Sequence, residues 1–346
     1  MPPWLTGDEQ ETLNARSEYL TSQDDGTAEH RINQYVVKQE IGRGSFGAVH
    51  VAVDQYGTEY AVKEFSKARL RKRAQSHILR KPLSQRKRAR GGLQGFNSPL
   101  HRRTGDDTTQ EVENPLELIK EEIAIMKKLN HPNLVQLIEV LDDPSEDSLY
   151  MVMEMCKKGV VQRIDLDLQS RADPYPEETC RLYFRDLILG IEYLHSQGIV
   201  HRDIKPDNCL INQDDVLKVV DFGVSEMFEK DSEMLTAKSA GSPAFLPPEL
   251  CVVKHGDVSG RAADIWSMGA TLYCLKYGQI PFQKQQIFDL YESIKEDEPD
   301  LSMEKDNHFC DLMLRMLEKD PIKRIKMPQL RVTTTSPAWM LLLTIF

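Results

Sequence analysis

Two short stretches decide the fold of this 346-residue chain: His201-Arg202-Asp203-Ile204-Lys205-Pro206-Asp207-Asn208 and, thirteen residues after Asn208, Asp221-Phe222-Gly223. Asp203 could accept a proton from an incoming hydroxyl group, and Lys205 could neutralise charge on a phosphate during its transfer. Asn208 and Asp221 offer the hard oxygen ligands that Mg²⁺ prefers. This set fits phosphoryl transfer, which needs alignment and charge neutralisation more than covalent chemistry.

The two stretches resemble the H-R-D-x-x-x-x-N and D-F-G motifs of the eukaryotic protein kinases. Lys205, two positions after Asp203, matches the serine/threonine pattern within that family. The alternative interpretation is a polar turn between two strands. The resemblance implies an α+β, bilobal protein kinase fold with a β-rich N-lobe and a mainly helical C-lobe, which uses ATP and Mg²⁺.

A glycine-rich stretch, Ile41-Gly42-Arg43-Gly44-Ser45-Phe46-Gly47-Ala48-Val49, lies near the N-terminus. Dinucleotide-binding folds use the same glycine spacing, but there the glycines open a helix. Here the alternating, β-branched run Val49–Val53 follows, which predicts a loop between two strands. An ordinary glycine-rich hairpin is the alternative. By resemblance, this stretch covers the phosphates of ATP and contributes Ile41, Gly42, Gly44, Gly47 and Val49 to the ATP site.

The next strand contains Tyr60-Ala61-Val62-Lys63, which resembles the V-A-I-K pattern of the kinases. An inward-facing lysine is costly to bury unless it is paired, so Lys63 needs phosphate oxygens and a carboxylate. By resemblance the carboxylate is Glu122, on a helix around residues 118–126. The neighbouring Glu121 points about 100° away on such a helix and would face solvent. The resemblance also places Ala61 at the ATP site.

An apolar strand, residues 149–156, runs into a linker before Lys157. By resemblance Met153 lies beside the adenine, and the backbone of Glu154 and Cys156 contacts its edge. Leu210 would line the floor of the same pocket. The alternative for Met153 is an ordinary core methionine.

Helix-start signals precede the catalytic stretch. Pro176-Glu177-Glu178 combines proline with acids at the positive end of a helix dipole and predicts a helix that runs to His195. Its buried side is expected to carry Leu182, Leu187, Ile191 and Leu194.

Residues 223–240 are polar and suit an activation loop. Thr236 and Ser239 are its best phosphate acceptors, with Arg202 as the cation that would receive a phosphate; whether either residue is modified stays open. Residues 241–249 resemble the segment that positions a peptide substrate. By resemblance Glu249 pairs with Arg324, and Asp264 anchors the backbone of the catalytic loop.

Composition divides the chain further. Residues 1–34 are expected to be a polar disordered leader, 35–335 the kinase domain and 336–346 a short apolar tail. Within the domain, residues 66–115 form a basic Arg/Pro insert, with thirteen Lys plus Arg and no acid between Ser66 and Arg103. The insert could be a docking arm for an acidic partner, a nuclear-import signal or a solvated disordered loop.

The insert and several stretches, such as Asp221-Phe222-Gly223-Val224-Ser225, resemble the calcium/calmodulin-dependent protein kinase kinases. The substrate implied is the activation-loop threonine of another protein kinase. No basic amphipathic helix follows the kinase core, so the calmodulin-binding segment of that family is not visible in the sequence. A pseudokinase scaffold and a small-molecule or lipid kinase are the alternatives. A pseudokinase normally lacks the Lys, the catalytic Asp or the metal-binding Asp, and this sequence has all three. A small-molecule or lipid kinase does not need a segment like residues 241–249, which shapes a groove for an extended peptide.

Overall composition excludes other classes. The net charge of −10 argues against a nucleic-acid binder. Six scattered cysteines argue for reduced thiols in an intracellular protein rather than a disulfide framework. No apolar run approaches the ~18 residues of a membrane-spanning helix, so no membrane partner is expected. The expected location is the cytoplasm, with the nucleus as a second location because of the basic insert.

Overall fold

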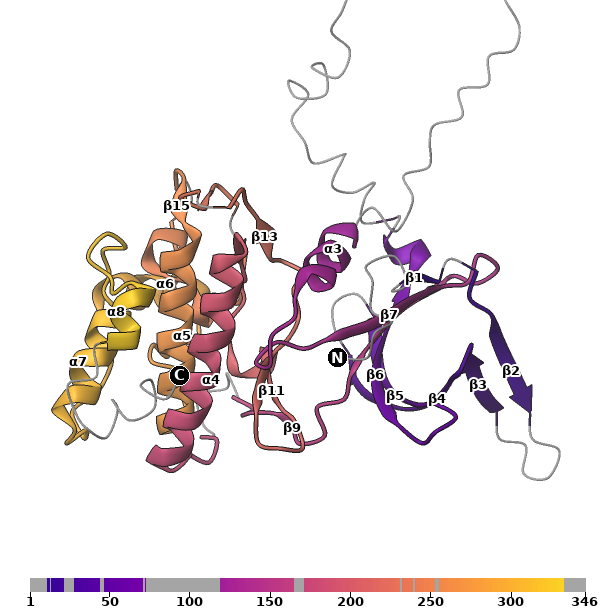
Figure 1. The fold of residues 1–346 in the computed structure, drawn as a ribbon. Coiled ribbons are helices and arrows are strands. Elements are labelled where there is room, and N and C mark those ends of the chain that lie inside the picture. Colours follow the sequence, from indigo (N-terminus) through magenta and orange to yellow (C-terminus); the bar gives the residue numbers. More distant parts are fainter. Residues whose placement is uncertain are drawn as a thin grey trace, which may run out of the picture. The chain divides into compact units, whose positions relative to one another are not determined.

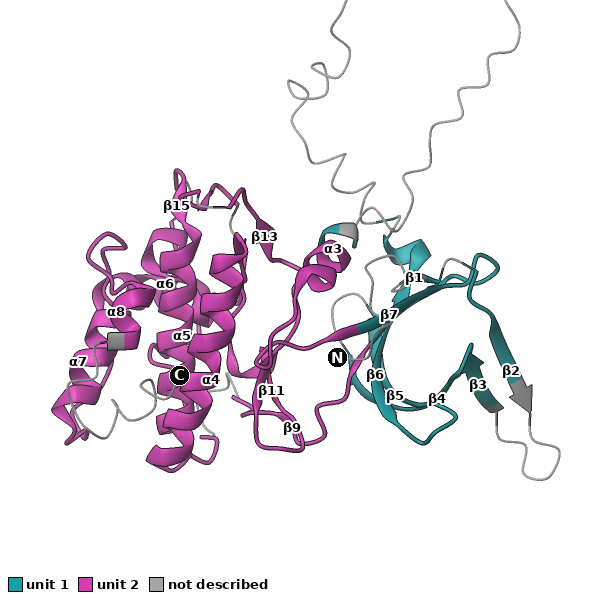
Figure 2. Cartoon of the chain, in the orientation of Figure 1, with its two compact units in different colours: residues 1–121, 138–152 teal, residues 122–137, 153–346 magenta. Residues whose placement is uncertain are grey.

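A computed structural model describes residues 11–12, 14–21, 28–43, 47–70, 72, 119–164, 171–230, 232–238, 240–252 and 255–332. The chain divides into two compact units (Figure 2). Unit 1 comprises residues 1–121 and 138–152, and unit 2 comprises residues 122–137 and 153–346. A β-rich unit and a mainly helical unit agree with the bilobal kinase fold expected from the sequence.

One curled sheet with the order β1-β7-β8-β6-β5-β4-β3-β2 makes up most of unit 1 (Figure 1). Its strands are β1 (Glu11–Thr12), β2 (Ser17–Thr21), β3 (Ala28–Ile32), β4 (Tyr35–Arg43), β5 (Gly47–Val53), β6 (Glu59–Ser66), β7 (Leu137–Asp142) and β8 (Ser148–Glu154). All neighbours from β2 to β6 are antiparallel, whereas β1 runs parallel to β7. The glycine-rich stretch therefore joins two paired strands, as its β-branched continuation predicted.

Alternation along β5 and β6 gives the sheet two different faces. Val49 lies opposite Lys63, so these two side chains share a face. Val62 and Ala52 point to the other face, where both are fully buried. Gly47 lies so close to β6 that an added Cβ would overlap the carbonyl oxygen of Glu64. The pairing of the glycine-rich stretch with β6 therefore needs glycine at this position.

The N-terminal segment differs from the expected disordered leader. Strands β1, β2 and β3 lie within residues 1–34 and extend the sheet. Backbone N–H groups of Ala15 and Ser17 donate to the carbonyl oxygen of Asp142 and the Oδ2 atom of Asp143, at 3.0 and 2.7 Å. Polar composition concealed these strands because edge strands carry polar side chains on their solvent side.

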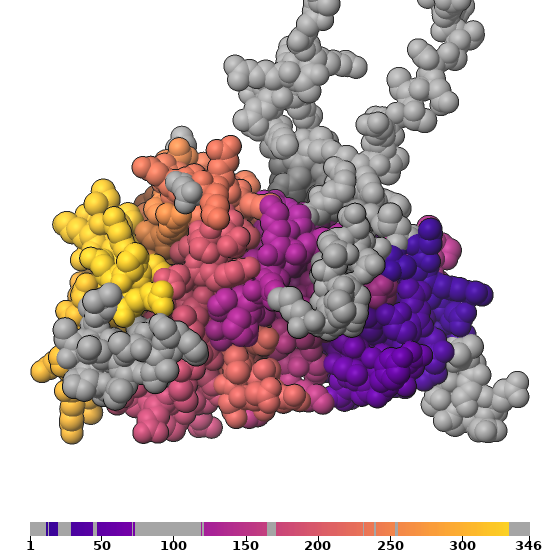
Figure 3. Space-filling view, viewed as in Figure 1, coloured from indigo at the N-terminus to yellow at the C-terminus, as the bar shows by residue number. Residues whose placement is uncertain are grey.

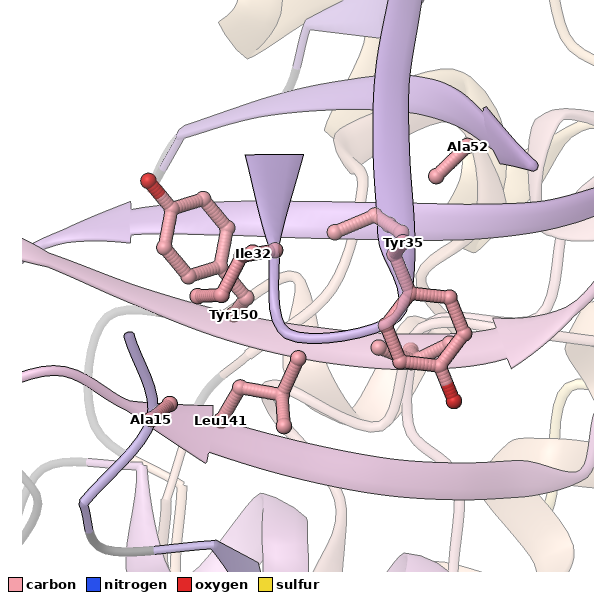
Figure 4. Close-up of a cluster of buried hydrophobic side chains, with 8 residues drawn as sticks. Ala15, Ile32, Tyr35, Ala52, Leu141 and Tyr150 are labelled. Atoms are coloured by element: carbon pink, nitrogen blue, oxygen red, sulfur yellow. The ribbon is translucent and has the colours of Figure 1, made fainter. Parts of the chain in front are cut away.

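A hydrophobic cluster fastens this segment to the rest of unit 1 (Figure 4). Ile32 is fully buried and Ala15 and Tyr35 are nearly so. The cluster consists of Ala15, Ile32, Tyr35, Ala52, Val62, Leu141, Tyr150 and Val152. Ala15 lies between β1 and β2, and the other members come from β3 to β8, so the N-terminal segment and the kinase strands share one core.

Unit 2 is built mainly of helices. They are α3 (Lys120–Lys128, which begins in unit 1), α4 (Glu177–Ser196), α5 (Gly260–Tyr277), α6 (Ile287–Glu296), α7 (Asn307–Met316) and α8 (Met327–Val332). Short 3₁₀ turns occur at η3 (Pro206–Asn208), η4 (Pro243–Phe245) and η5 (Pro248–Leu250). Figure 3 shows the surface of the C-terminal helices in orange and yellow.

Small sheets in unit 2 carry the loops between these helices. The strands are β9 (Gly159–Val160), β10 (Ile199–Val200), β11 (Cys209–Ile211), β12 (Leu217–Val219), β13 (Glu226–Met227), β14 (Leu235–Thr236) and β15 (Val258–Ser259). They pair as β12-β11-β9, β10-β13 and β14-β15. Strand β10 lies directly before the catalytic stretch in sequence, and β13, which pairs with it, follows that stretch.

Helix α4 begins and ends where the sequence predicted. Pro176 is the N-cap, and Glu177 and Glu178 lie in the first turn. Of the residues expected on its buried side, Leu187, Ile191 and Leu194 are buried, but Leu182 is 44% exposed, so that part of the prediction is wrong. Tyr183 and Phe184 are buried instead, because they precede Leu187 by four and three residues and share its face, whereas Leu182 precedes it by five.

All six cysteines lie in unit 2, and all except Cys310 are buried. None forms a disulfide. Among the helices that the structure describes, none is both long and apolar enough to cross a membrane. Most of the basic insert and the tail at residues 336–346 fall outside the described residues.

We expect Ile32→Ala to lower the free energy of unfolding by about 2–5 kcal/mol, because the side chain is fully buried in the shared core. Thermal unfolding followed by calorimetry would measure the loss. Arg31→Ala, an exposed change on the same strand, is the control and should leave the transition nearly unchanged. Equal transitions for the two variants would show that the N-terminal strands do not belong to this core.

Candidate active site

The catalytic stretch of unit 2 is anchored by Asp264, a fully buried residue of α5. Its Oδ2 atom accepts a hydrogen bond from the backbone N–H of His201 at 3.0 Å, and its Oδ1 atom accepts one from Arg202 at 2.8 Å. The Nε2 atom of His195 lies 2.8 Å from Oδ2. The geometry agrees with the anchoring role that the family pattern implied for Asp264.

Asp203 lies at the centre of a compact polar cluster. Its Oδ1 atom accepts hydrogen bonds from the backbone N–H and the hydroxyl of Ser242, both at 2.8 Å. Its Oδ2 atom lies 3.0 Å from the Nζ atom of Lys205 and accepts a 3.0 Å hydrogen bond from Nδ2 of Asn208. Three of the residues predicted from the sequence are therefore brought together, and the carboxylate is held from both sides.

Ser242 is a member of this cluster that sequence reasoning did not single out. Its hydroxyl accepts a 2.7 Å hydrogen bond from Nζ of Lys205 while it donates to Asp203. Gly241 precedes it with φ of +118°, and an added Cβ would lie 2.6 Å from the carbonyl oxygen of Arg202. A hydroxyl residue directly after a glycine, at the start of the substrate-positioning segment, was the available signal.

The two predicted metal ligands lie on neighbouring loops. The backbone N–H of Val220 donates to the carbonyl oxygen of Asn208 at 3.0 Å, which places Asp221 next to the catalytic stretch. Asp221 is exposed and has φ of +64°, a left-handed conformation that is unusual for a residue with a side chain. Because Nδ2 of Asn208 donates to Asp203, its amide oxygen is the atom that remains for a cation.

An acidic residue, Glu226, occupies the position next to Arg202 where the sequence suggested a phosphate. The Nη1 atom of Arg202 lies 2.9 Å from Oε2 of Glu226. Thr236 is 3% exposed, and Ser239 falls outside the described residues.

The residues predicted to bind adenine from unit 2 are held by a separate network. Glu154 contacts Lys218 through a 2.7 Å ion pair, and its backbone N–H donates to the carbonyl oxygen of Gln136 at 3.1 Å. Cys156 is buried, Met153 is half-buried, and Leu210 lies on β11 opposite Lys218. The side chain and the backbone N–H of Glu154 are therefore structural, which leaves its backbone carbonyl oxygen for a ligand.

Unit 1 carries the other predicted ATP residues. Val49, Ala61 and Lys63 share one face of the sheet, because Val49 is paired with Lys63 and Ala61 is two residues away on the same strand. The Nζ atom of Lys63 lies 5.1 Å from the ring centroid of Phe65. Ile41 is 42% exposed on β4, and Gly42 is paired with Val49. Gly44 falls outside the described residues.

Helix α3 separates the two adjacent glutamates as the sequence predicted. Glu122 is buried and Glu121 is exposed. The pairing of Glu122 with Lys63 stays a prediction.

A buried ion pair supports the substrate-positioning segment. The Nη1 and Nη2 atoms of Arg324 lie 2.7 and 2.9 Å from the two carboxylate oxygens of Glu249. The Arg324 side chain is fully buried, and it also donates to the carbonyl oxygens of Glu318 and Ala262. The structure thus contains the pair that the family pattern implied.

Comparison with known proteins gives a consistent picture. The protein kinase domain family matches residues 103–334. A calcium/calmodulin-dependent protein kinase kinase of Emericella nidulans is 63% identical over 325 residues, which is 93% of this chain and 61% of that protein. A protein with the same description from Caenorhabditis elegans is 40% identical over 88% of this chain and 52% of its own length.

A serine/threonine-protein kinase of Schizosaccharomyces pombe is 36% identical over 302 residues, which is 86% of this chain and 82% of that protein. The chain thus spans 61% and 52% of the length of the two kinase kinases that it matches.

We expect Glu249→Gln to lower the free energy of unfolding by about 3–5 kcal/mol, because it leaves the buried Arg324 guanidinium without its counter-charge. Urea unfolding would measure the change. Lys323→Ala removes an exposed neighbouring ion pair, with a side chain 74% exposed, and serves as the control, with an expected effect of at most about 1 kcal/mol. An unchanged midpoint for Glu249→Gln would contradict the structural role of the pair.

Proposed function

The chain belongs to the protein kinase family, and we propose that it transfers the γ-phosphate of ATP to a serine or threonine hydroxyl of a protein substrate. The observation that carries the proposal is the Asp203 cluster, in which Ser242, Lys205 and Asn208 hold the carboxylate. A carboxylate fixed in this way can orient a substrate hydroxyl and accept its proton. A pseudokinase has no need for this arrangement.

The residues have separate proposed roles. Asp203 accepts the proton of the attacking hydroxyl, and Lys205, which contacts both Asp203 and Ser242, neutralises charge on the transferred phosphoryl group. Lys63, supported by Glu122, is proposed to orient the α- and β-phosphates.

Mg²⁺ is the metal proposed for this site. An amide oxygen and a carboxylate, from Asn208 and Asp221, are a donor set that suits a hard cation. When bound, Mg²⁺ supplies charge neutralisation at the phosphate oxygens. The chain itself contributes by holding both ligands on adjacent loops.

The substrate is proposed to be the activation-loop threonine of another protein kinase. Two relatives that cover most of this chain are described as protein kinase kinases. Residues 241–249, which resemble the segment that positions a peptide substrate, include Ser242 beside Asp203 and support this class. A cytoplasmic location, with the nucleus as a second one, is also proposed from the composition and the basic insert.

We expect Asp203→Asn to lower kcat by about 10²- to 10⁴-fold, because the proton acceptor is lost. ATP affinity, measured by calorimetric titration, should stay close to that of the unaltered chain. Asp207→Asn, at an exposed carboxylate of the same stretch, is the matched control and should keep its kcat. Near-normal turnover by Asp203→Asn would contradict the assigned role.

The substrate class is tested with a catalytically inactive protein kinase that has an intact activation loop. The chain and Mg·ATP are incubated with it in the presence and absence of calcium and calmodulin, and the modified site is identified by mass spectrometry. We expect phosphate on the activation-loop threonine, and none when that threonine is replaced by alanine. Autophosphorylation without labelling of the substrate would support the kinase activity and contradict the substrate class. A rate that rises with calmodulin would add calmodulin as a regulatory partner.

A further inference from the structure

The carboxylate of Glu226, on β13, is contacted by three groups from two segments of unit 2. The Nη1 atom of Arg202 lies 2.9 Å from its Oε2 atom. The hydroxyl of Thr236 donates to the same oxygen at 2.6 Å. The Nζ atom of Lys238 lies 3.0 Å from Oε1. One side chain therefore joins the catalytic stretch to the segment around residues 235–238.

Burial strengthens these contacts. The side chains of Arg202 and Glu226 are only 7% and 15% exposed. Burial alone would raise the pKa of Glu226, but the Thr236 hydroxyl and the charges of Lys238 and Arg202 outweigh it and hold that pKa below its usual value. The carboxylate is therefore charged at neutral pH, and charge-assisted hydrogen bonds in a partly buried site are stronger than those between neutral groups.

The backbone places Glu226 at this position. Strand β13 pairs with β10 so that Glu226 lies opposite Val200, immediately before His201. The Ser225 hydroxyl donates to the carbonyl oxygen of His201 at 3.1 Å. Arg202 has φ of +71°, and its Nη2 atom donates to the carbonyl oxygen of Lys238 at 3.2 Å. The left-handed conformation of Arg202, next to Asp203, is thus held by contacts from both sides.

Phosphorylation of Thr236 would oppose this arrangement. Its hydroxyl is a buried donor to Glu226 and has little access to solvent. A phosphate there would bring roughly two negative charges against a carboxylate that already satisfies Arg202. Repulsion and loss of solvation would both disfavour that form.

We propose that Glu226 is a positioning residue that takes the place of an activation-loop phosphate. Its carboxylate neutralises Arg202 and holds the catalytic stretch ready for transfer without modification of Thr236. This inference rests on the proposed kinase activity and concerns the regulation of the same site.

The first experiment compares phosphorylated and unphosphorylated chain. The protein is produced with a co-expressed protein phosphatase, and its intact mass shows that it carries no phosphate. We expect the kcat of this form, at saturating ATP and peptide, to lie within about twofold of the kcat after preincubation with Mg·ATP. An unphosphorylated chain that is inactive and becomes active on phosphorylation would overturn the proposal.

The second experiment uses Glu226→Gln, which keeps the shape and removes the charge. We expect kcat to fall by about 10- to 100-fold, the factor for losing a hydrogen bond to a charged group, with little change in the KM for ATP. Glu226→Asp should restore part of the loss. Glu229→Gln, at an exposed acid on the same segment, is the matched control and should keep its kcat. If Glu226→Gln also kept its kcat, the proposal would fail.

The rate of amide hydrogen exchange in residues 224–238 tests the Glu226 contacts without relying on phosphoryl-transfer activity. Glu226→Gln should exchange faster there than the unaltered chain, and Glu229→Gln should not. If Glu226→Gln exchanged faster but neither the phosphorylated nor the unphosphorylated chain transferred phosphate, the structural role of Glu226 would be supported. The proposed kinase function would be overturned instead. Unchanged exchange would overturn the role of Glu226. If Glu226→Gln does not fold, the comparison of the phosphorylated and unphosphorylated chain still decides the proposal.

Discussion

The catalytic geometry depends on one buried carboxylate, that of Asp264. It accepts hydrogen bonds from two consecutive backbone N–H groups, at His201 and Arg202, and so fixes the chain where φ of Arg202 is +71°. A left-handed residue with a long side chain costs free energy, on the order of 1 kcal/mol or more, and persists only where surrounding contacts determine it. Asp264 lies on α5, a long buried helix, so the strain is supported by a rigid element. The position of Asp203, the next residue, follows from this constraint.

Two further carboxylates, Asp203 and Glu226, connect the catalytic stretch to the segments that follow it. Asp203 is bound by Ser242, and Glu226 is bound by Arg202 and Thr236. Each acid therefore serves as a junction between loops in addition to its local chemistry. Because both carboxylates are partly buried, the loss of any one contact costs free energy, so a change at either carboxylate affects both of the segments that it joins. This coupling explains how short polar loops with little core of their own keep a defined arrangement.

Sequence reasoning succeeded where partners are close along the chain or where a motif has fixed spacing. Asp203, Lys205 and Asn208 lie within one turn-rich stretch, and the structure brings them together. The family pattern selected Glu122, helical geometry turned Glu121 away from it, and the structure has Glu122 buried and Glu121 exposed. Ser242 and Glu226 were missed because their contacts span 39 and 24 residues and depend on how the loops pack. The strands β2 and β3 were missed for a different reason: their side chains are polar, and only the burial of Ile32 and the pairing with β4 show that they belong to the sheet.

Because of where the cysteines lie, chemical labelling of thiols can report on the opening of one unit of the chain. All six thiols lie in unit 2, and burial raises the pKa of Cys156, Cys209 and Cys251 to about 12 and that of Cys180 to about 11. Alkylating reagents attack the thiolate, so these groups become reactive only when unit 2 opens. The rate of labelling at these four thiols therefore reports the opening of unit 2, which carries Asp203, and gives no information on unit 1, which carries Lys63. The two halves of a kinase can in this way be distinguished by covalent chemistry, without any added probe.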